Sequence, residues 1–194
     1  MYELFFQDFN KKAGLTVEEQ EEIRAFLTPK KLRKRQYLLQ EGDICKAIAF
    51  VEKGALREYS VDESGAEHII QFATEGWYIS DMYSFLTGTP SRLNVECLED
   101  CELAQISKDT LEELYIKVPK LERFFRKLVQ NAYIAVGQRL LSSMSRTAQE
   151  RYLEFIEKYP HIEQRVPDRH IASFLGIAPE SLSRIRRQYS GQKS

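Results

Sequence analysis

The sequence has few cysteines and no long apolar run, and both shortages exclude whole classes of protein. Its three cysteines, Cys45, Cys97 and Cys101, are too scattered for the framework of a disulfide-rich secreted domain. A four-thiolate iron–sulfur cluster cannot be built within one chain from three thiols, so we expect ordinary sheet residues and no metal site. No apolar run approaches the roughly 18–20 residues that a membrane-spanning helix needs.

Targeting and catalytic signatures are also missing. Residues 1–8, Met-Tyr-Glu-Leu-Phe-Phe-Gln-Asp, lack the basic start and the apolar core of a secretory signal, so we expect a cytoplasmic protein. No glycine-rich phosphate loop and no recognisable nucleophile context occurs along the chain. We therefore expect no enzymatic activity, no catalytic residue and no certain cofactor.

The charge is unevenly distributed along the 194 residues, a length that suits one large or two small domains. Residues 1–138 contain 18 Lys and Arg against 23 Asp and Glu, whereas residues 139–194 contain 10 against 6. A mildly acidic body with a basic end indicates that any contact with a polyanion lies near the C-terminus.

From about residue 31 to residue 107 the apolar pattern is typical of short strands. Brief apolar or alternating runs are separated by turn signals such as Glu41-Gly-Asp, Lys53-Gly and Glu63-Ser-Gly. Many short strands at regular spacing predict a closed antiparallel roll or barrel.

Helical patterns flank this region. Thr16 to Leu27 is predicted as a short helix, with Thr16 as its cap and Glu19 at the capping-box position. A long helix is predicted over 119–144, and a further one follows from Thr147 to Tyr159. Because the long helix has two apolar faces, one can pack on the roll and the other on a second copy of the helix. The alternative is a single buried core helix.

The last thirty residues predict two short helices around a tight turn. Ile171 and Leu175 share one helix face, and Gly176 follows where a helix end favours a residue that accepts positive φ. Pro179 suits the first position of the next helix, and Glu180 places a negative charge in its first turn. This pattern indicates a helix-turn-helix, the motif that places its second helix in the major groove of DNA. A small helical hairpin with a solvated basic face is the plainer alternative.

The order of roll, long helix and terminal helix-turn-helix resembles that of the Crp/Fnr family of bacterial transcription regulators. The resemblance covers nearly the whole chain and is strongest in the Leu-Thr-Gly-Thr-Pro-Ser-Arg string of residues 86–92 and in the Pro-Glu-Ser-Leu-Ser-Arg string of residues 179–184. It implies an α+β fold, with a cyclic-nucleotide-binding-type sensor roll over 1–118, a dimerisation helix over 119–144 and a DNA-binding domain over 145–194. It also implies a homodimer on a palindromic site of double-stranded DNA, with RNA polymerase and a small-molecule effector as further partners. Because the sequence ends soon after the second helix, we expect no full β-wing there.

The resemblance also implies roles for single residues. Glu180, Ser181 and Arg184 would face base edges, since Arg can bind guanine in a fork and Glu can accept from the cytosine amino group. The family often has an Arg where this chain has Pro179, so the preferred half-site should differ. The residues expected to hold phosphates are Arg169, His170, Arg186 and Arg187.

The ligand pocket of the roll departs from the family pattern. Nucleotide-binding members use a Gly-Glu pair and an Arg-Ser/Thr-Ala string, whereas this chain has Ser80-Asp81 and Ser91-Arg92-Leu93, with Asn131 on the long helix. Asp is shorter than Glu, and the swapped order turns Arg92 to the other face of a strand. An unknown small ligand, or none, is therefore favoured over a cyclic nucleotide.

The sequence leaves a second function open. The roll could be a ligand-binding module whose C-terminal helices contact a protein and not DNA. The two hypotheses differ at Arg184, Arg186 and Arg187, which contact DNA in only one of them.

Overall fold

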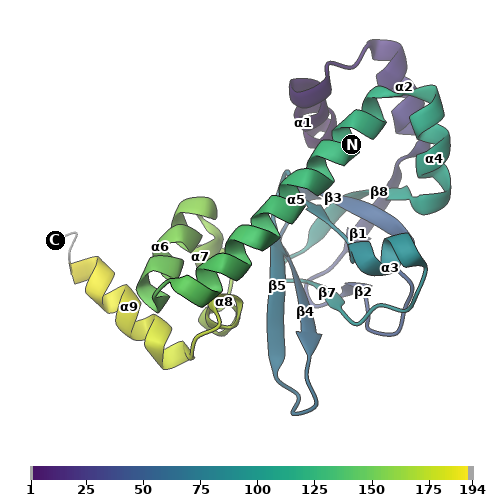
Figure 1. Ribbon diagram of the computed structural model, residues 1–194. Helices are drawn as coiled ribbons and strands as arrows, with labels where there is room; N and C mark the ends of the chain where they lie inside the picture. Colours follow the sequence, from purple (N-terminus) through teal and green to yellow (C-terminus); the bar gives the residue numbers. More distant parts are fainter. Residues whose placement is uncertain (1, 192–194) are drawn as a thin grey trace. The chain divides into compact units, whose positions relative to one another are not determined.

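The computed structural model describes residues 2–191, which form two compact units. The first unit comprises residues 1–60 and 71–130, and the second comprises residues 61–70 and 131–194. The chain therefore passes between the units within one β-hairpin and again within one long helix. Figure 1 labels most of the elements, numbered in chain order.

The β-roll of the first unit is made of two four-stranded sheets, with strand orders β1-β8-β3-β6 and β2-β7-β4-β5. Strand pairs such as β1–β8 and β4–β7 are antiparallel, as the alternating pattern predicts. The hairpin between β4 and β5 continues into the second unit. The strands are β1 Thr28–Leu32, β2 Tyr37–Leu39, β3 Ala47–Lys53, β4 Leu56–Val61, β5 Glu67–Ala73, β6 Tyr78–Ile79, β7 Asn94–Cys97 and β8 Cys101–Ser107.

Four helices accompany the roll: α1 Glu3–Ala13, α2 Val17–Phe26, α3 Met82–Thr87 and α4 Lys108–Lys117. The predicted capping box of α2 is present, because Thr16 Oγ1 accepts from the Glu19 N–H and the Glu19 carboxylate accepts from the Thr16 N–H. Helix α1 was not predicted. Its first turn is held by Glu52, whose carboxylate accepts the N–H groups of Leu4 and Phe5 at 3.2 and 2.8 Å.

Aromatic side chains join α1, the roll and the start of the long helix α5, Lys120–Ser145. The rings of Phe9 and Phe124 stack with centroids 4.0 Å apart, and Phe5 meets Phe50 edge to face at 5.4 Å. The first turns of α5 therefore belong to the core of the first unit.

Further along α5 the apolar residues are exposed. Tyr133, Val136, Leu140 and Met144 recur at steps of three and four, and each is at least 62% exposed. The helix is thus buried at its start and carries an uncovered apolar stripe later. This pattern differs from that of a single buried core helix.

The second unit contains α6 Ala148–Lys158, α7 Ile162–Arg165, α8 Asp168–Leu175 and α9 Pro179–Gly191. A second capping box starts α6, with Thr147 Oγ1 accepting from Glu150 N and the Glu150 carboxylate accepting from Thr147 N at 2.8 Å. The predicted α+β fold, with roll, long helix and terminal helix pair, is confirmed. The predicted absence of a full wing concerns residues 192–194, which lie outside the described residues.

Candidate nucleic-acid interface

Helices α8 and α9 are joined by a tight turn at Gly176. This residue has φ +64°, and its N–H is directed at the carbonyls of Ala172 and Ser173. The next N–H, of Ile177, bonds the Ala172 carbonyl at 3.0 Å. These bonds satisfy the last carbonyls of α8 while the chain reverses, which is why the sequence places glycine here. The turn therefore fixes where α9 begins.

The apolar face of α9 packs back onto α6 and α8. Leu182 and Ile185 are buried on α9, and Ile171, Ala172 and Leu175 are buried on α8. The predicted packing of these residues is therefore present.

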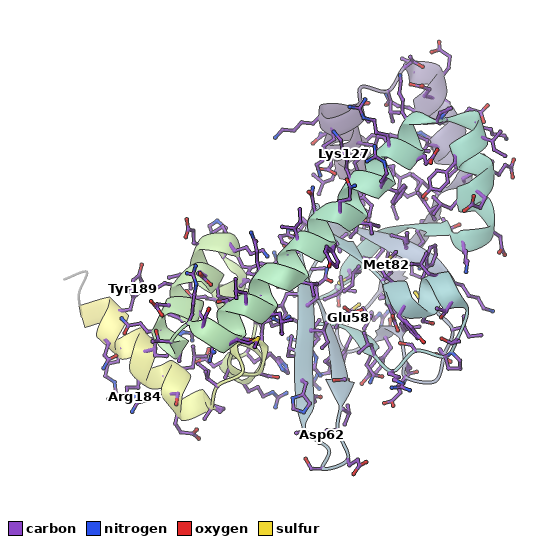
Figure 2. All side chains as sticks on the ribbon, viewed as in Figure 1. Glu58, Asp62, Met82, Lys127, Arg184 and Tyr189 are labelled. Atoms are coloured by element: carbon purple, nitrogen blue, oxygen red, sulfur yellow. The ribbon has the colours of Figure 1, made fainter. Side chains whose placement is uncertain are left out.

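The opposite face of α9 is exposed and polar. Glu180, Ser183, Arg184 and Arg187 follow each other at steps of three, one and three, which keeps them on one side of the helix. Figure 2 shows Arg184 projecting from α9. Ser181, predicted to share this face, is half-buried at its edge, whereas Ser183, which was not predicted, lies within it.

An open groove of about 490 Å³ runs beside this face, between the start of α6 and α9. Ser181 and Arg184 line it, so both border a space that is accessible from solvent. The other lining residues are Thr147, Ala148, Gln149, Ile177, Ala178, Ile185 and Gln188.

The four residues predicted to hold phosphates lie in different surroundings. Arg169 and Arg187 are exposed and free to reach outward. His170 is buried, with Nδ1 3.9 Å from a Glu67 carboxylate oxygen, so the structure does not support its predicted phosphate contact. Arg186 is half-buried and ion-paired within the unit, so its predicted role also needs revision.

His170 is buried because residues 61–70 of the hairpin pack on α8. Ser173 Oγ donates to the Glu67 carbonyl at 2.7 Å and accepts from the Ile69 N–H at 3.0 Å. Arg139 of α5 donates to the Ile69 carbonyl at 3.0 Å and stacks on the Phe174 ring at 4.0 Å. Hairpin, α5 and α8 are therefore held together by directional contacts.

Within the roll, the residues of the predicted ligand pocket bond mostly to their own neighbours. Asp81 caps α3, with Oδ1 accepting from Ser84 N at 3.1 Å and Oδ2 from Ser91 Oγ at 2.6 Å. Ser80 Oγ donates to the Met82 sulfur, and Arg92 is exposed. The structure brings Asp81 and Ser91 together, but it does not place Arg92 among buried residues. Asn131 is exposed on α5.

A buried acid on β4 was not predicted. The side chain of Glu58 is buried beside Val95 of β7, and its Oε1 has no hydrogen-bond partner among the described residues. Burial raises its pKa to about 8, and the nearby charge of Asp81 adds to the rise. Glu58 lies two residues after the buried Leu56, so both side chains share one face of the strand, and this spacing was the available signal.

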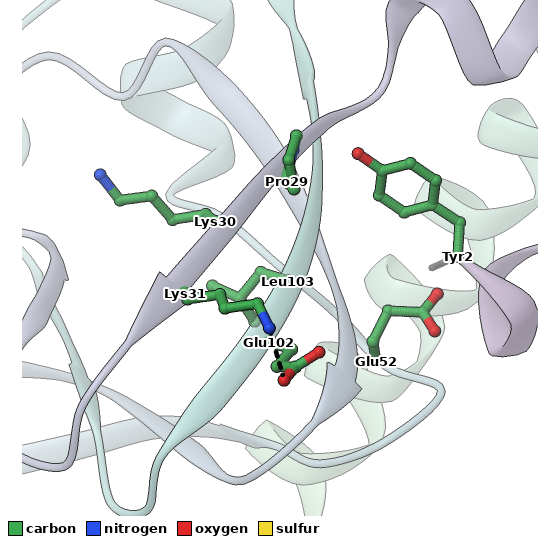
Figure 3. Close-up of a pocket in the computed structure, with 7 residues that line it drawn as sticks. All are labelled: Tyr2, Pro29, Lys30, Lys31, Glu52, Glu102 and Leu103. Atoms are coloured by element: carbon green, nitrogen blue, oxygen red, sulfur yellow. Dashed lines mark hydrogen bonds and ion pairs between the residues drawn. The ribbon is translucent and has the colours of Figure 1, made fainter.

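A second hollow, between β1 and the start of α1, is shown in Figure 3. Its volume is about 40 Å³, and Lys31 and Glu102 close one side with an ion pair of 3.0 Å. Such a space holds little more than a water molecule, so it is not a ligand site. The remaining lining residues are Tyr2, Pro29, Lys30, Glu52 and Leu103.

Residues 2–191 contain neither a membrane-spanning helix nor a metal-binding cluster. No helix in this part of the chain is long and apolar enough to cross a membrane. The same residues contain no group of three or more His, Cys, Asp and Glu side chains arranged to hold a metal ion. The three cysteines are free and buried.

Comparisons with known proteins agree with the fold and the motif. Residues 29–117 match the family model of the cyclic nucleotide-binding domain. The transcriptional activator protein FnrA of Stutzerimonas stutzeri is 26% identical over 168 residues, which cover 79% of this chain and 67% of the relative.

Solved structures establish the same architecture. FixK2 from Bradyrhizobium japonicum superposes with a TM-score of 0.74 at 21% identity, covering 86% of both chains. The c-di-GMP-responsive global regulator CLP of Xanthomonas campestris gives a TM-score of 0.71 at 14% identity, covering 92% of this chain and 93% of CLP.

Proposed function

Because the chain belongs to the Crp/Fnr family of transcription regulators, we propose that it binds a palindromic DNA site as a homodimer and regulates transcription there. The observation that carries this proposal is the exposed polar face of α9, where Glu180 and Arg184 stand one helical turn apart. A helix-turn-helix inserts this part of its second helix into the major groove.

The chemistry of the exposed face supports separate roles for its residues, some reading bases and others binding phosphates. Arg184 is suited to the O6 and N7 atoms of guanine, and Glu180 to the amino group of cytosine, each contact contributing roughly 1–3 kcal/mol of discrimination. Ser181 lines the groove between α6 and α9 from the edge of the exposed face. We propose that Ser183, which is exposed on that face, also contacts bases. Arg169 and Arg187 are proposed to bind phosphates, which orient the helix without reading sequence.

The apolar stripe on α5 supports the homodimer. Tyr133, Val136, Leu140 and Met144 are exposed along one face, and a second copy of the same helix would cover them. In such a dimer the two recognition helices would meet half-sites about 34–36 Å apart, one turn of DNA. We assign residues 119–144 to this dimerisation role and residues 145–194 to DNA binding.

Residues 1–118 are proposed to form the sensor, whose signal would shift the dimer between states. The side chains of Glu58 and Asp81 are both buried inside the roll, and the buried guanidinium of Arg57 is already paired with Glu96 at 2.6 Å. An acidic interior whose buried guanidinium is already paired offers no evident partner to the phosphate of a cyclic nucleotide. We therefore propose a different effector, with RNA polymerase as the protein partner of the bound dimer.

Selection of bound duplexes from a random DNA pool, at defined salt, tests the proposal. The wild type should enrich a palindrome, and Arg184→Ala should lose preference at one base pair of each half-site. Gln164→Ala, at an exposed residue of α7, is the control and should enrich the same palindrome. Failure of the wild type to enrich any sequence, with and without cell extract as a source of effector, would overturn the proposal.

A further inference from the structure

Arg186 and Arg187 are adjacent in sequence but lie on different faces of α9, one half-buried and the other exposed. Arg186 is four residues after the buried Leu182, and it shares the inner face with Ile185 and Tyr189. Arg187 is three residues after Arg184 and shares its exposed face. Two basic side chains with the same chemistry therefore have different surroundings.

The guanidinium of Arg186 is bound on two sides within the second unit. Its Nη2 lies 3.1 Å from Glu163 Oε1 of α7, and its Nη1 pairs with the carboxylate of Asp168 at the start of α8. The Glu163 carboxylate also accepts the hydroxyl of Tyr152 on α6, whose ring lies 6.0 Å from the guanidinium. One side chain of α9 thus contacts three other helices of the unit.

These contacts occupy the charge that a phosphate would need. The Arg186 side chain is only 25% exposed, and two carboxylates already neutralise it. Moving it to a DNA phosphate would leave Asp168 and Glu163 facing a polyanion without their partner. Arg187 forms no ion pair with the described residues and is free to bind a phosphate.

We propose that Arg186 is a positioning residue for base recognition, and not a phosphate contact. By tying α9 to α6, α7 and α8, it fixes the rotation of α9 about its own axis, so that Glu180 and Arg184 reach their bases together. This inference rests on the proposed DNA-binding function and specifies how that site is kept in register. A fork of two donors held by two separate carboxylates gives directional control that apolar packing of Leu182 alone does not supply.

Arg186→Gln and Arg187→Gln form a matched pair for the test. Affinity is measured for the duplex enriched by the wild type and for one with the Arg184-dependent base pair changed, between 50 and 200 mM salt. Arg187→Gln should weaken both duplexes equally and reduce the slope of log affinity against log salt by about 1.8, the value for two phosphates, because each subunit of the dimer loses one contact. Arg186→Gln should keep the wild-type slope and reduce the preference between the duplexes by about fivefold or more, the lower end for one base contact.

A reduced salt slope in Arg186→Gln, equal to that of Arg187→Gln, would show a phosphate contact and overturn the proposal. Unchanged slope with unchanged preference would overturn it as well. Arg186→Lys replaces the Gln variant if that variant does not fold. It keeps the positive charge but lacks the two-pronged guanidinium, so it should also lose the preference between the duplexes while the salt slope stays unchanged.

Asp168→Asn supplies an independent check, since it removes one carboxylate that holds Arg186. It should reduce the preference as Arg186→Gln does, and the double variant should be no worse than either single variant. Additive losses would mean that the two residues act separately. If the wild type itself prefers no sequence, the proposed function fails, an outcome distinct from failure of the Arg186 assignment alone.

Discussion

Replacing Glu58 by Gln should stabilise the roll, and more so as the pH rises. The carboxyl group is buried on β4 with Oε1 unpaired, and its pKa is raised from 4.5 to about 8 by burial and by Asp81. At a pH between these values, the folded protein holds a proton that the unfolded chain has released. The free energy of unfolding therefore falls as the pH rises through this window.

The size of the effect follows from the two pKa values. Each pH unit between 4.5 and about 8 lowers the free energy of unfolding by about 1.4 kcal/mol, so the full loss is roughly 5 kcal/mol. Roughly seven-tenths of this loss should already be present at pH 7. Gln cannot ionise and has nearly the same volume, so the Glu58→Gln variant should lack the decline.

Urea unfolding at fixed protein concentration, from pH 5 to pH 9, measures this difference. Trp77 is the single tryptophan and packs against the core of the first unit, so its fluorescence reports on that unit. Glu63→Gln, at an exposed acid in the β4–β5 hairpin, is the matched control and should follow the wild type. Parallel curves for wild type and Glu58→Gln across pH 5–8 would refute the reasoning, because they would mean that the buried acid ionises without cost.

Three further changes test other parts of the structure. Leu140→Glu should convert the homodimer to monomer in sedimentation at micromolar concentration, whereas Gln138→Glu, off the apolar stripe, should not. Gly54→Ala should lower the free energy of unfolding by more than about 1 kcal/mol, because φ is +100° and the new Cβ would lie 2.6 Å from Cys101 Sγ. Thermal unfolding would detect that loss, and a melting temperature equal to that of the wild type would contradict it. Thr147→Ala should lower stability by about 1 kcal/mol by removing the cap of α6; an unchanged urea midpoint would count against that contribution.

The helix pair was predictable because its signals are local. Gly176 and Pro179 mark the turn, and the apolar residues on either side recur at helical spacing. The same spacing could have placed two residues better. Ser183 lies four residues before the exposed Arg187, whereas Ser181 lies four before the buried Ile185.

Other features depend on contacts between distant segments, which local patterns do not reveal. His170 is buried by the hairpin at Glu67, about a hundred residues earlier in the chain. Helix α1 depends on Glu52 of β3 to hold its first turn. The alternation of β4 places Glu58 inward, but only the packed roll shows that its carboxyl group finds no partner.

The passage of the chain between its units limits how the protein can be divided. A fragment that begins at residue 131 retains α6 to α9 but loses residues 61–70, which belong to the same unit. Ser173 Oγ would lose both hydrogen-bond partners in the hairpin, and Arg139 would lose the carbonyl of Ile69. His170, which is buried in the intact chain, would lose its neighbour Glu67. A fragment of residues 131–194 would therefore differ in its contacts and stability from the same residues in the intact chain, and DNA affinities measured on it would not describe the whole protein.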